Sequence, residues 1–231
     1  MRKPSAKPFA ARKKPLRSSA RELKPAMHDT ILNTAQKLFF RFGFRSVSMD
    51  DIARGCGISK KTLYQHFADR NTLVEAVVDA LLERHAAEAR QCRGNAANAV
   101  EEVWLGLHSP FALLAAVNYN FFHELEKYFP LLWEKVLAYG RNRMKPRIVA
   151  NLERGIGEGL YEPGTDTAFA AEIRIQQLRT ALNPAGFESG HSSSEALFGA
   201  LTVFFLQAVS TQKGRKLISK YFNLEHGNAT K

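Results

Sequence analysis

From residue 28 onward, apolar side chains recur with the period of an α-helix along almost the whole chain. In the clearest segment they fall at i, i+1, i+4, i+7, i+8 and i+11, as Ile31, Leu32, Ala35, Leu38, Phe39 and Phe42. That spacing places them on one helical face, and Gly43 follows as a helix stop. No segment combines strict alternation with β-branched residues, which is the pattern of a strand. We therefore predict an all-α protein.

Basic residues are concentrated at the N-terminal end. The chain has a net charge of +11, and residues 1–27 alone carry nine basic residues against one acidic residue, Glu22. An excess of this size favours a polyanionic partner, either a nucleic acid or an anionic membrane surface. We interpret residues 1–27, which show no helical or strand period, as a flexible basic arm. Two roles stay open for it: a solvated tail, or a segment that lies along phosphates or enters a minor groove.

Several classes of protein are excluded by what the chain lacks. The longest apolar run, at residues 111–117, has seven residues, far short of the roughly 20 that a bilayer span needs. No apolar segment follows the basic start, so we expect no secretory signal. Cys56 and Cys92 form no CxxC pair or Cys/His cluster, so we expect no disulfide framework, no metal and no cofactor. The expectation is a cytoplasmic protein without membrane insertion.

Residues 28–75 carry the pattern of a three-helix domain with a helix-turn-helix motif at about 48–67. Ser48 is a cap for a first short helix, and Ser59 is a cap for a second one. Between them Gly57 supplies the freedom for positive φ that a tight reversal requires. In such a motif the second helix can enter a DNA major groove.

The second helix of the motif separates into two faces. Leu63 and Phe67 lie inward, and the outward set is rich in hydrogen-bond donors and contains no acid. Lysine can reach guanine, glutamine can pair with adenine and threonine can touch a thymine methyl, whereas tyrosine and a helix-start arginine suit phosphates. The alternative is an ordinary solvated face. Our predicted DNA-binding residues are Ser48, Ser59, Lys60, Lys61, Thr62, Tyr64, Gln65, His66 and Arg70.

A Gly-x-Ser turn at 57–59 is followed by Leu63-Tyr64-x-His66-Phe67. With these residues, the segment 31–73 resembles the DNA-binding domain of TetR-family transcriptional regulators. The resemblance implies an all-helical homodimer with N-terminal DNA-binding heads and a C-terminal domain that binds a small molecule and dimerises. It also implies a phosphate contact for Tyr64 and, where the family usually has lysine, for Arg70. Lys61 stands where many members have a small residue, so its base contacts do not transfer.

We predict that residues 76–231 form a helical ligand-binding and dimerisation domain, linked to the head by an amphipathic helix from Thr72 to about Cys92. Nine aromatic residues lie between Trp104 and Tyr139. They suit a packed core, and the alternative is an apolar pocket with a few polar groups. For that pocket, and for an unknown apolar or aromatic effector, the candidates are Trp104, His108, Phe111, Asn118, Phe122, His123 and Trp133.

Two helical patterns near the end of the chain, at 166–182 and 194–211, differ in character. The second is apolar nearly all round, which requires burial on more than one side. We predict a four-helix dimer interface with two helices from each chain, and the alternative is a wholly intramolecular core helix. The predicted interface residues are Phe169, Ile173, Leu197, Leu201, Phe204, Phe205 and Ala208.

Together these patterns predict a sequence-specific DNA-binding transcriptional regulator. In the full form of the hypothesis it is a ligand-responsive homodimeric repressor of a palindromic operator, with double-stranded DNA, a second copy and a small-molecule effector as partners. We do not expect an enzyme, because Cys56 has no motif partner and the chain has no GxSxG, P-loop or dinucleotide fingerprint. The alternative function is a non-specific DNA-compacting or anionic-surface-binding protein that acts through the basic arm.

Overall fold

The computed structural model describes residues 20–117, 119–182 and 193–228, and over these ranges the predicted all-α fold is confirmed. The described part contains no strand, and its single isolated bridge joins Tyr161 to Ser210. The elements are α1 (Ala20–Phe42), α2 (Met49–Cys56), α3 (Lys60–His66), α4 (Arg70–Asn95), α5 (Ala99–Gly106), the π-helical turn η1 (Leu107–Phe111), α6 (Ala112–Ala115), α7 (Tyr119–Tyr128), α8 (Pro130–Tyr139), the π-helical turn η2 (Gly140–Met144), α9 (Lys145–Gly157), α10 (Thr167–Leu182), α11 (Ser194–Val209) and α12 (Gln212–Asn228).

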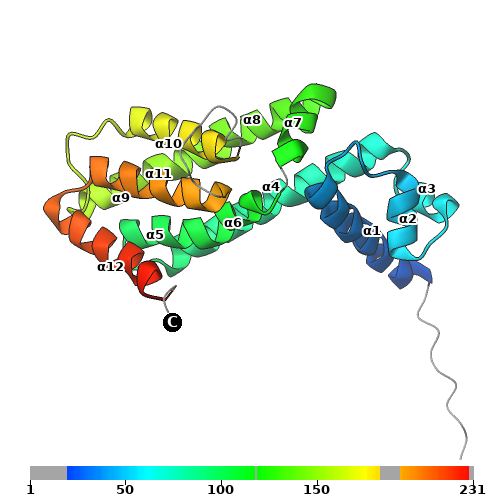
Figure 1. Ribbon diagram of the computed structural model, residues 1–231, viewed down its shortest axis with the longest axis horizontal. Helices are drawn as coiled ribbons and strands as arrows, with labels where there is room; N and C mark the ends of the chain where they lie inside the picture. Colours follow the sequence, from blue (N-terminus) through cyan, green and yellow to red (C-terminus); the bar gives the residue numbers. More distant parts are fainter. Residues whose placement is uncertain (1–19, 118, 183–192, 229–231) are drawn as a thin grey trace, which may run out of the picture.

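The molecule is elongated, with a small head at one end and a larger helical body at the other (Figure 1). Helices α1, α2 and α3 form the head, and α4 runs from the head into the body. In the body α10 packs against both α9 and α11, while α12 crosses the far end against α5 and α11. The helix-turn-helix motif therefore lies at the end of the molecule opposite α12 (Figure 1).

The first helix begins earlier than we predicted. Residues 20–27, which we assigned to the flexible arm, belong to α1. The run from Ala20 to Lys24 consists of alanine, arginine, glutamate, leucine and lysine, all strong helix formers that the charge-based interpretation overlooked. The remainder of the predicted arm, residues 1–19, lies outside the described residues.

One apolar core runs without interruption from the head into the body. In the head it is built from residues such as Ile31, Phe39 and Leu63, all with no exposed surface. The same cluster continues through α4 to Phe121 and Phe198 in the body. A second cluster, which includes Leu152, Tyr161 and Leu206, fills the far end. The head and the near half of the body are thus packed as one unit.

Three prolines of the body differ in their effect on the helices. Pro130 begins α8 after α7 ends at Tyr128. Pro110 does not start a helix; it lies inside η1, where a wider π turn lets the helix from Ala99 to Ala115 continue past the missing N–H. Pro146 lies in the first turn of α9, a position that proline tolerates.

Helix α12 was not predicted, although its signal is present. Leu217, Ile218, Tyr221 and Phe222 recur at helical spacing among lysines, and Ile218 and Phe222 are buried in the far cluster. No single described helix is long and apolar enough to cross a membrane; only the bent pair Ala99–Ala115 with Asn120–Tyr128 reaches that length and composition.

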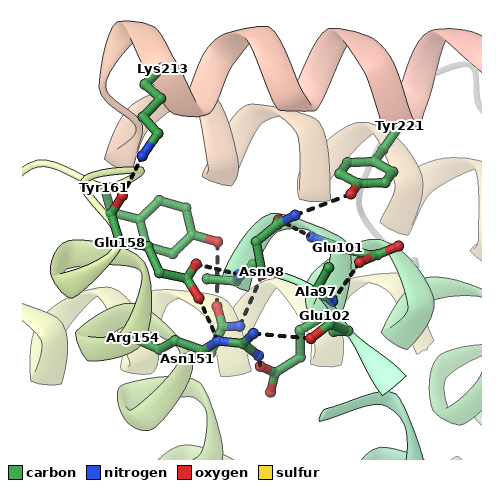
Figure 2. Close-up of polar contacts among 12 residues, drawn as sticks. Ala97, Asn98, Glu101, Glu102, Asn151, Arg154, Glu158, Tyr161, Lys213 and Tyr221 are labelled. Atoms are coloured by element: carbon green, nitrogen blue, oxygen red, sulfur yellow. Dashed lines mark hydrogen bonds and ion pairs between the residues drawn. The ribbon is translucent and has the colours of Figure 1, made fainter. Parts of the chain in front are cut away.

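A polar network fastens the start of α5 to α9 (Figure 2). Arg154 donates to Glu102 Oε2 at 3.1 Å, to Glu158 Oε1 at 2.7 Å and to the Ala96 carbonyl at 3.0 Å. Glu158 in turn accepts from the Ala99 N–H at 2.8 Å. The hydrogen bonds and charges of Glu158 and Glu102 raise the pKa of Arg154. The Arg154 side chain is three-quarters buried, and each nitrogen of its guanidinium donates a hydrogen bond. Arg154 therefore fixes the direction in which α5 leaves α4.

Close packing at Gly155 generates a stability prediction. A Cβ on Gly155 would overlap the ring of Tyr161, whereas a Cβ on Gly157 of the same helix would meet open space. We expect Gly155→Ala to lower the free energy of unfolding by about 1–3 kcal/mol through overpacking. Gly157→Ala should leave it unchanged or raise it by up to about 1 kcal/mol, because alanine is the better helix former. Urea unfolding followed by circular dichroism measures both, and equal losses in the two variants would contradict the packing argument.

Candidate functional site

The helix-turn-helix geometry is set by caps on both sides of the turn. The Ser48 hydroxyl accepts from the Asp51 N–H at 3.2 Å, and Asp51 Oδ2 accepts from the Ser48 N–H at 3.0 Å. This reciprocal capping box starts α2 and lowers the pKa of Asp51, because the hydrogen bonds from Ser48 favour the carboxylate. At the other end of α2, Gly57 has φ +66°, and the Ile58 N–H donates to the Ala53 carbonyl at 3.0 Å.

The second helix of the motif, α3, has one buried edge and one exposed edge. Leu63 is 0% exposed and Phe67, which caps the helix, is 2% exposed. On the opposite edge Lys61, Tyr64 and Gln65 are exposed, with Tyr64 at 42%. No described part of the chain covers these three side chains, so a groove of duplex DNA has access to them.

Lys60 has an acidic neighbour that the helix pattern did not reveal. Its ammonium lies 3.0 Å from Asp50 Oδ1, a residue of α2. The hydrogen bond and the charge of Asp50 raise the pKa of Lys60. Both side chains are about half exposed, so the pair is weak in water and a phosphate can exchange with the carboxylate.

Several polar residues in our predicted set are engaged inside the head. Ser59 caps α3 by accepting from the Thr62 N–H at 3.0 Å, and the two hydroxyls lie 2.8 Å apart. His66 is half-buried, and its ring centroid lies 6.4 Å from that of His28 on α1. With Ser48 in the capping box, these four residues position the motif.

Arg70 is also tied to its own head. It is the first residue of α4, and its guanidinium donates to the carbonyl of Phe44 in the loop between α1 and α2. Its Nε is buried without a hydrogen-bond partner. Asp69 caps the same helix by accepting from the Thr72 N–H at 2.7 Å. The structure therefore places Arg70 under the α1–α2 loop, in contrast to the solvent-facing position that a phosphate contact would favour.

Helix α7 of the body holds that same loop from the other side. Glu124 Oε2 accepts from the Arg45 N–H at 3.0 Å, and a Cβ on Gly43, whose φ is +77°, would lie within 2.9 Å of this oxygen. The Arg45 guanidinium reaches the Tyr128 hydroxyl at 3.3 Å. Below these contacts the ring of Phe44 lies 4.5 Å from that of Phe121. Head and body thus meet at α7 through polar and aromatic contacts together.

A cavity of about 500 Å³ lies behind α7. Its walls are mostly apolar and come from α4, α6, α7, α8 and α10, and the polar groups in them include His123, Glu126, Arg179 and Thr180. Phe122, His123 and Trp133, three of our seven pocket candidates, line it.

The other pocket candidates lie elsewhere. Trp104 packs beside Tyr221 of α12, with ring centroids 5.9 Å apart. Phe111 stacks on Phe198 at 3.7 Å in the core. His108 lines a groove between α1 and η1, and Asn118 lies outside the described residues. These candidates were grouped by their nearness in the sequence, which does not determine which face of a helix meets the cavity.

An apolar face is left uncovered on α10 and α11. Phe204 is 70% exposed, Phe169 64% and Ile173 40%. Leu201 is half-buried, and Ala208 is exposed. Leu197 and Phe205, which we assigned to the same interface, are instead 3% and 6% exposed inside their own subunit. On a helix that is apolar all round, the sequence does not tell one face from the other.

Comparison with known proteins gives consistent results. Residues 31–77 match the family model of bacterial regulatory proteins, tetR family. The HTH-type transcriptional regulator UidR of Escherichia coli is 41% identical over 61 residues, which is 26% of this chain and 31% of that protein. The uncharacterised HTH-type transcriptional regulator YvaF of Bacillus subtilis is 32% identical over 114 residues, which is 49% of this chain and 60% of that protein.

Solved structures extend the likeness to the body. A TetR-family regulator from Agrobacterium tumefaciens has a TM-score of 0.66 at 23% identity and covers 81% of this chain and 100% of its own. A TetR-family regulator from Chloroflexus aurantiacus has a TM-score of 0.66 at 20% identity, and the match covers 82% of this chain and 98% of that regulator. At these identities the likeness concerns the fold. The sequence matches to the first curated relatives span about a third of the length of those relatives.

Proposed function

Because the chain belongs to the tetR family of bacterial regulatory proteins, we propose that this DNA-binding regulator is a ligand-responsive repressor that acts as a homodimer on a palindromic operator. The observation that carries the proposal is the exposed edge of α3, where Lys61, Tyr64 and Gln65 have no described neighbour over them. These residue types read bases and hold phosphates. A role on chromosomal DNA also assigns the chain to the cytoplasm.

The uncovered face of α10 and α11 supports the homodimer. Three large apolar side chains, Phe169, Ile173 and Phe204, are exposed on adjacent helices, and a contiguous apolar patch of this kind typically marks an interface. A second copy related by a two-fold axis would cover it with the same helices and form a four-helix contact. Such an axis would also place two heads on successive major grooves, which is why the operator would be palindromic.

Helix α7 supports the response to a ligand. Phe122, His123 and Glu126 on it line the 500 Å³ cavity, while Glu124 and Tyr128 contact the α1–α2 loop of the head. A ligand that shifts α7 would change how the body holds the head. Since the cavity walls are mostly apolar, the effector we propose for it is apolar or aromatic, with a polar group near His123.

DNA recognition is tested by selecting bound duplexes from a random pool and measuring Kd on the selected operator and on a scrambled duplex. We expect Tyr64→Phe to weaken both duplexes alike, by about twofold to tenfold, because it removes a phosphate hydrogen bond. Gln65→Ala should weaken the operator alone by about 1–3 kcal/mol. Gln91→Ala, an exposed glutamine on α4, is the control. A pool that yields no preferred sequence, or equal losses for both variants on both duplexes, would contradict the proposal.

The dimer is tested by Phe204→Glu. A charge at this 70% exposed position would be buried in the proposed interface, so we expect the variant to sediment as a monomer with its circular dichroism unchanged. Leu131→Glu, at an 87% exposed position on α8, should stay dimeric. A wild type that is monomeric at micromolar concentration, or a dimeric Phe204→Glu, would count against the interface.

The contact between α7 and the head is tested by Glu124→Ala. Removing a charged acceptor from the Arg45 N–H costs about 1.5–3 kcal/mol locally, so we expect amide exchange in residues 43–47 to accelerate by about tenfold or more. Glu134→Ala, which removes an exposed acid of α8 that pairs with Arg141, should leave that exchange unchanged. If both variants exchange alike, α7 does not hold the loop.

A further inference from the structure

Arg174, on the inner side of α10, is an enclosed cation in the middle of the body. Its side chain is 8% exposed. The guanidinium donates to Thr202 Oγ1 at 2.6 Å and to Gln177 Oε1 at 3.1 Å, and it lies 4.1 Å from the ring centroid of Phe198 and 5.4 Å from that of Phe205. Every one of these contacts is electrically neutral.

Within the described ranges of the chain, no carboxylate forms an ion pair with this guanidinium. Burial lowers the pKa of Arg174 to about 9, and the charge of Tyr161 opposes this shift. A buried arginine without a counterion is costly, and proteins ordinarily pair such charges. An anion from outside the chain would supply the counterion that these contacts lack.

A small cavity adjoins the guanidinium. It has a volume of about 140 Å³, and its walls include Val103, Ile148 and Phe205. A second arginine, Arg147, also lines it, and the Nη1 of that arginine is buried without a hydrogen-bond partner. Two arginine side chains therefore line one space, and one of them has an unused donor.

The acid nearest to this space is already engaged. Glu102 lines the cavity, but its carboxylate pairs with Arg154 at 3.1 Å (Figure 2). His85 is buried, and its pKa is lowered to about 4, chiefly by desolvation and then by the charge of Arg147, so it is neutral at pH 7. The field in the cavity is consequently positive.

We propose that Arg174 and Arg147 form a binding site for the carboxylate of a small organic acid, with Val103, Ile148 and Phe205 around its apolar part. Planar guanidinium groups match a carboxylate in charge and shape. The volume equals that of roughly five liquid waters at about 30 Å³ each, so the ligand is a short-chain or single-ring monocarboxylate. This site is separate from the larger cavity behind α7, and it does not depend on the proposed repressor function.

The test is calorimetry on the full chain without DNA, with acetate, butyrate and benzoate as probes and benzamide as the neutral analogue of benzoate. We expect at least one acid to bind, and benzamide not to bind. Arg174→Met should weaken the binding acid by about tenfold or more, the loss expected for a hydrogen bond to a charged group. Arg93→Met, which removes an exposed arginine of α4, should bind like the wild type.

Folding of the variants is controlled in two ways. In Arg174→Met the Thr202 hydroxyl keeps its 2.6 Å bond to the Phe198 carbonyl, so we expect a melting temperature at or above that of the wild type without ligand. Arg147→Met provides a second variant with the same expected loss of affinity. Failure of all three acids to bind the wild type, binding of benzamide equal to that of benzoate, or unchanged affinity in both arginine variants would overturn the site.

Discussion

The burial of Phe44 between head and body is the contact on which the rest of the architecture depends. Phe44 is 1% exposed, and its ring lies 5.0 Å from Phe39 in the head and 4.5 Å from Phe121 in the body. Aromatic pairs at these separations add to the burial energy of the rings. The carbonyl of the same residue accepts from Arg70. Because the loop that carries Phe44 leads directly into α2, the body takes part in orienting the helix-turn-helix motif.

The basic residues of the head differ in how available they are. Lys60 is paired with Asp50 and Arg70 is bonded to the Phe44 carbonyl, so a phosphate has to displace an existing partner at either position. At Lys60 the displaced contact is exposed and weak in water, whereas at Arg70 it is half-buried and supports the loop. In the recognition we propose, the first contacts are therefore expected from Lys61, Tyr64 and Gln65, and the charge of the head is expected to add affinity that falls with salt.

Local patterns in the sequence predicted the helix caps and the turn, because these features depend on residues that are close together in the chain. The capping residues Ser48 and Ser59 and the turn at Gly57 all lie where their backbone preferences require. The contacts of Lys60 with Asp50 and of Arg45 with Glu124 were not predictable, since each partner comes from another helix. Likewise, helical spacing could not distinguish Phe204 from Phe205, because which of two adjacent apolar residues is buried depends on the neighbouring helices.

The two cavities are linked by a single side chain. Tyr139 lines the larger one, and its hydroxyl lies 2.7 Å from His85 Nδ1 and hydrogen-bonds Arg147, which lines the smaller one. A carboxylate that engages Arg147 would compete with this tyrosine for the guanidinium. A chain of contacts between two sites couples them only if some element along it can adopt two arrangements. Helix α7 is the candidate for that element, because it lines the larger cavity, contacts the head through Glu124 and is separated from α8 by the non-helical Phe129.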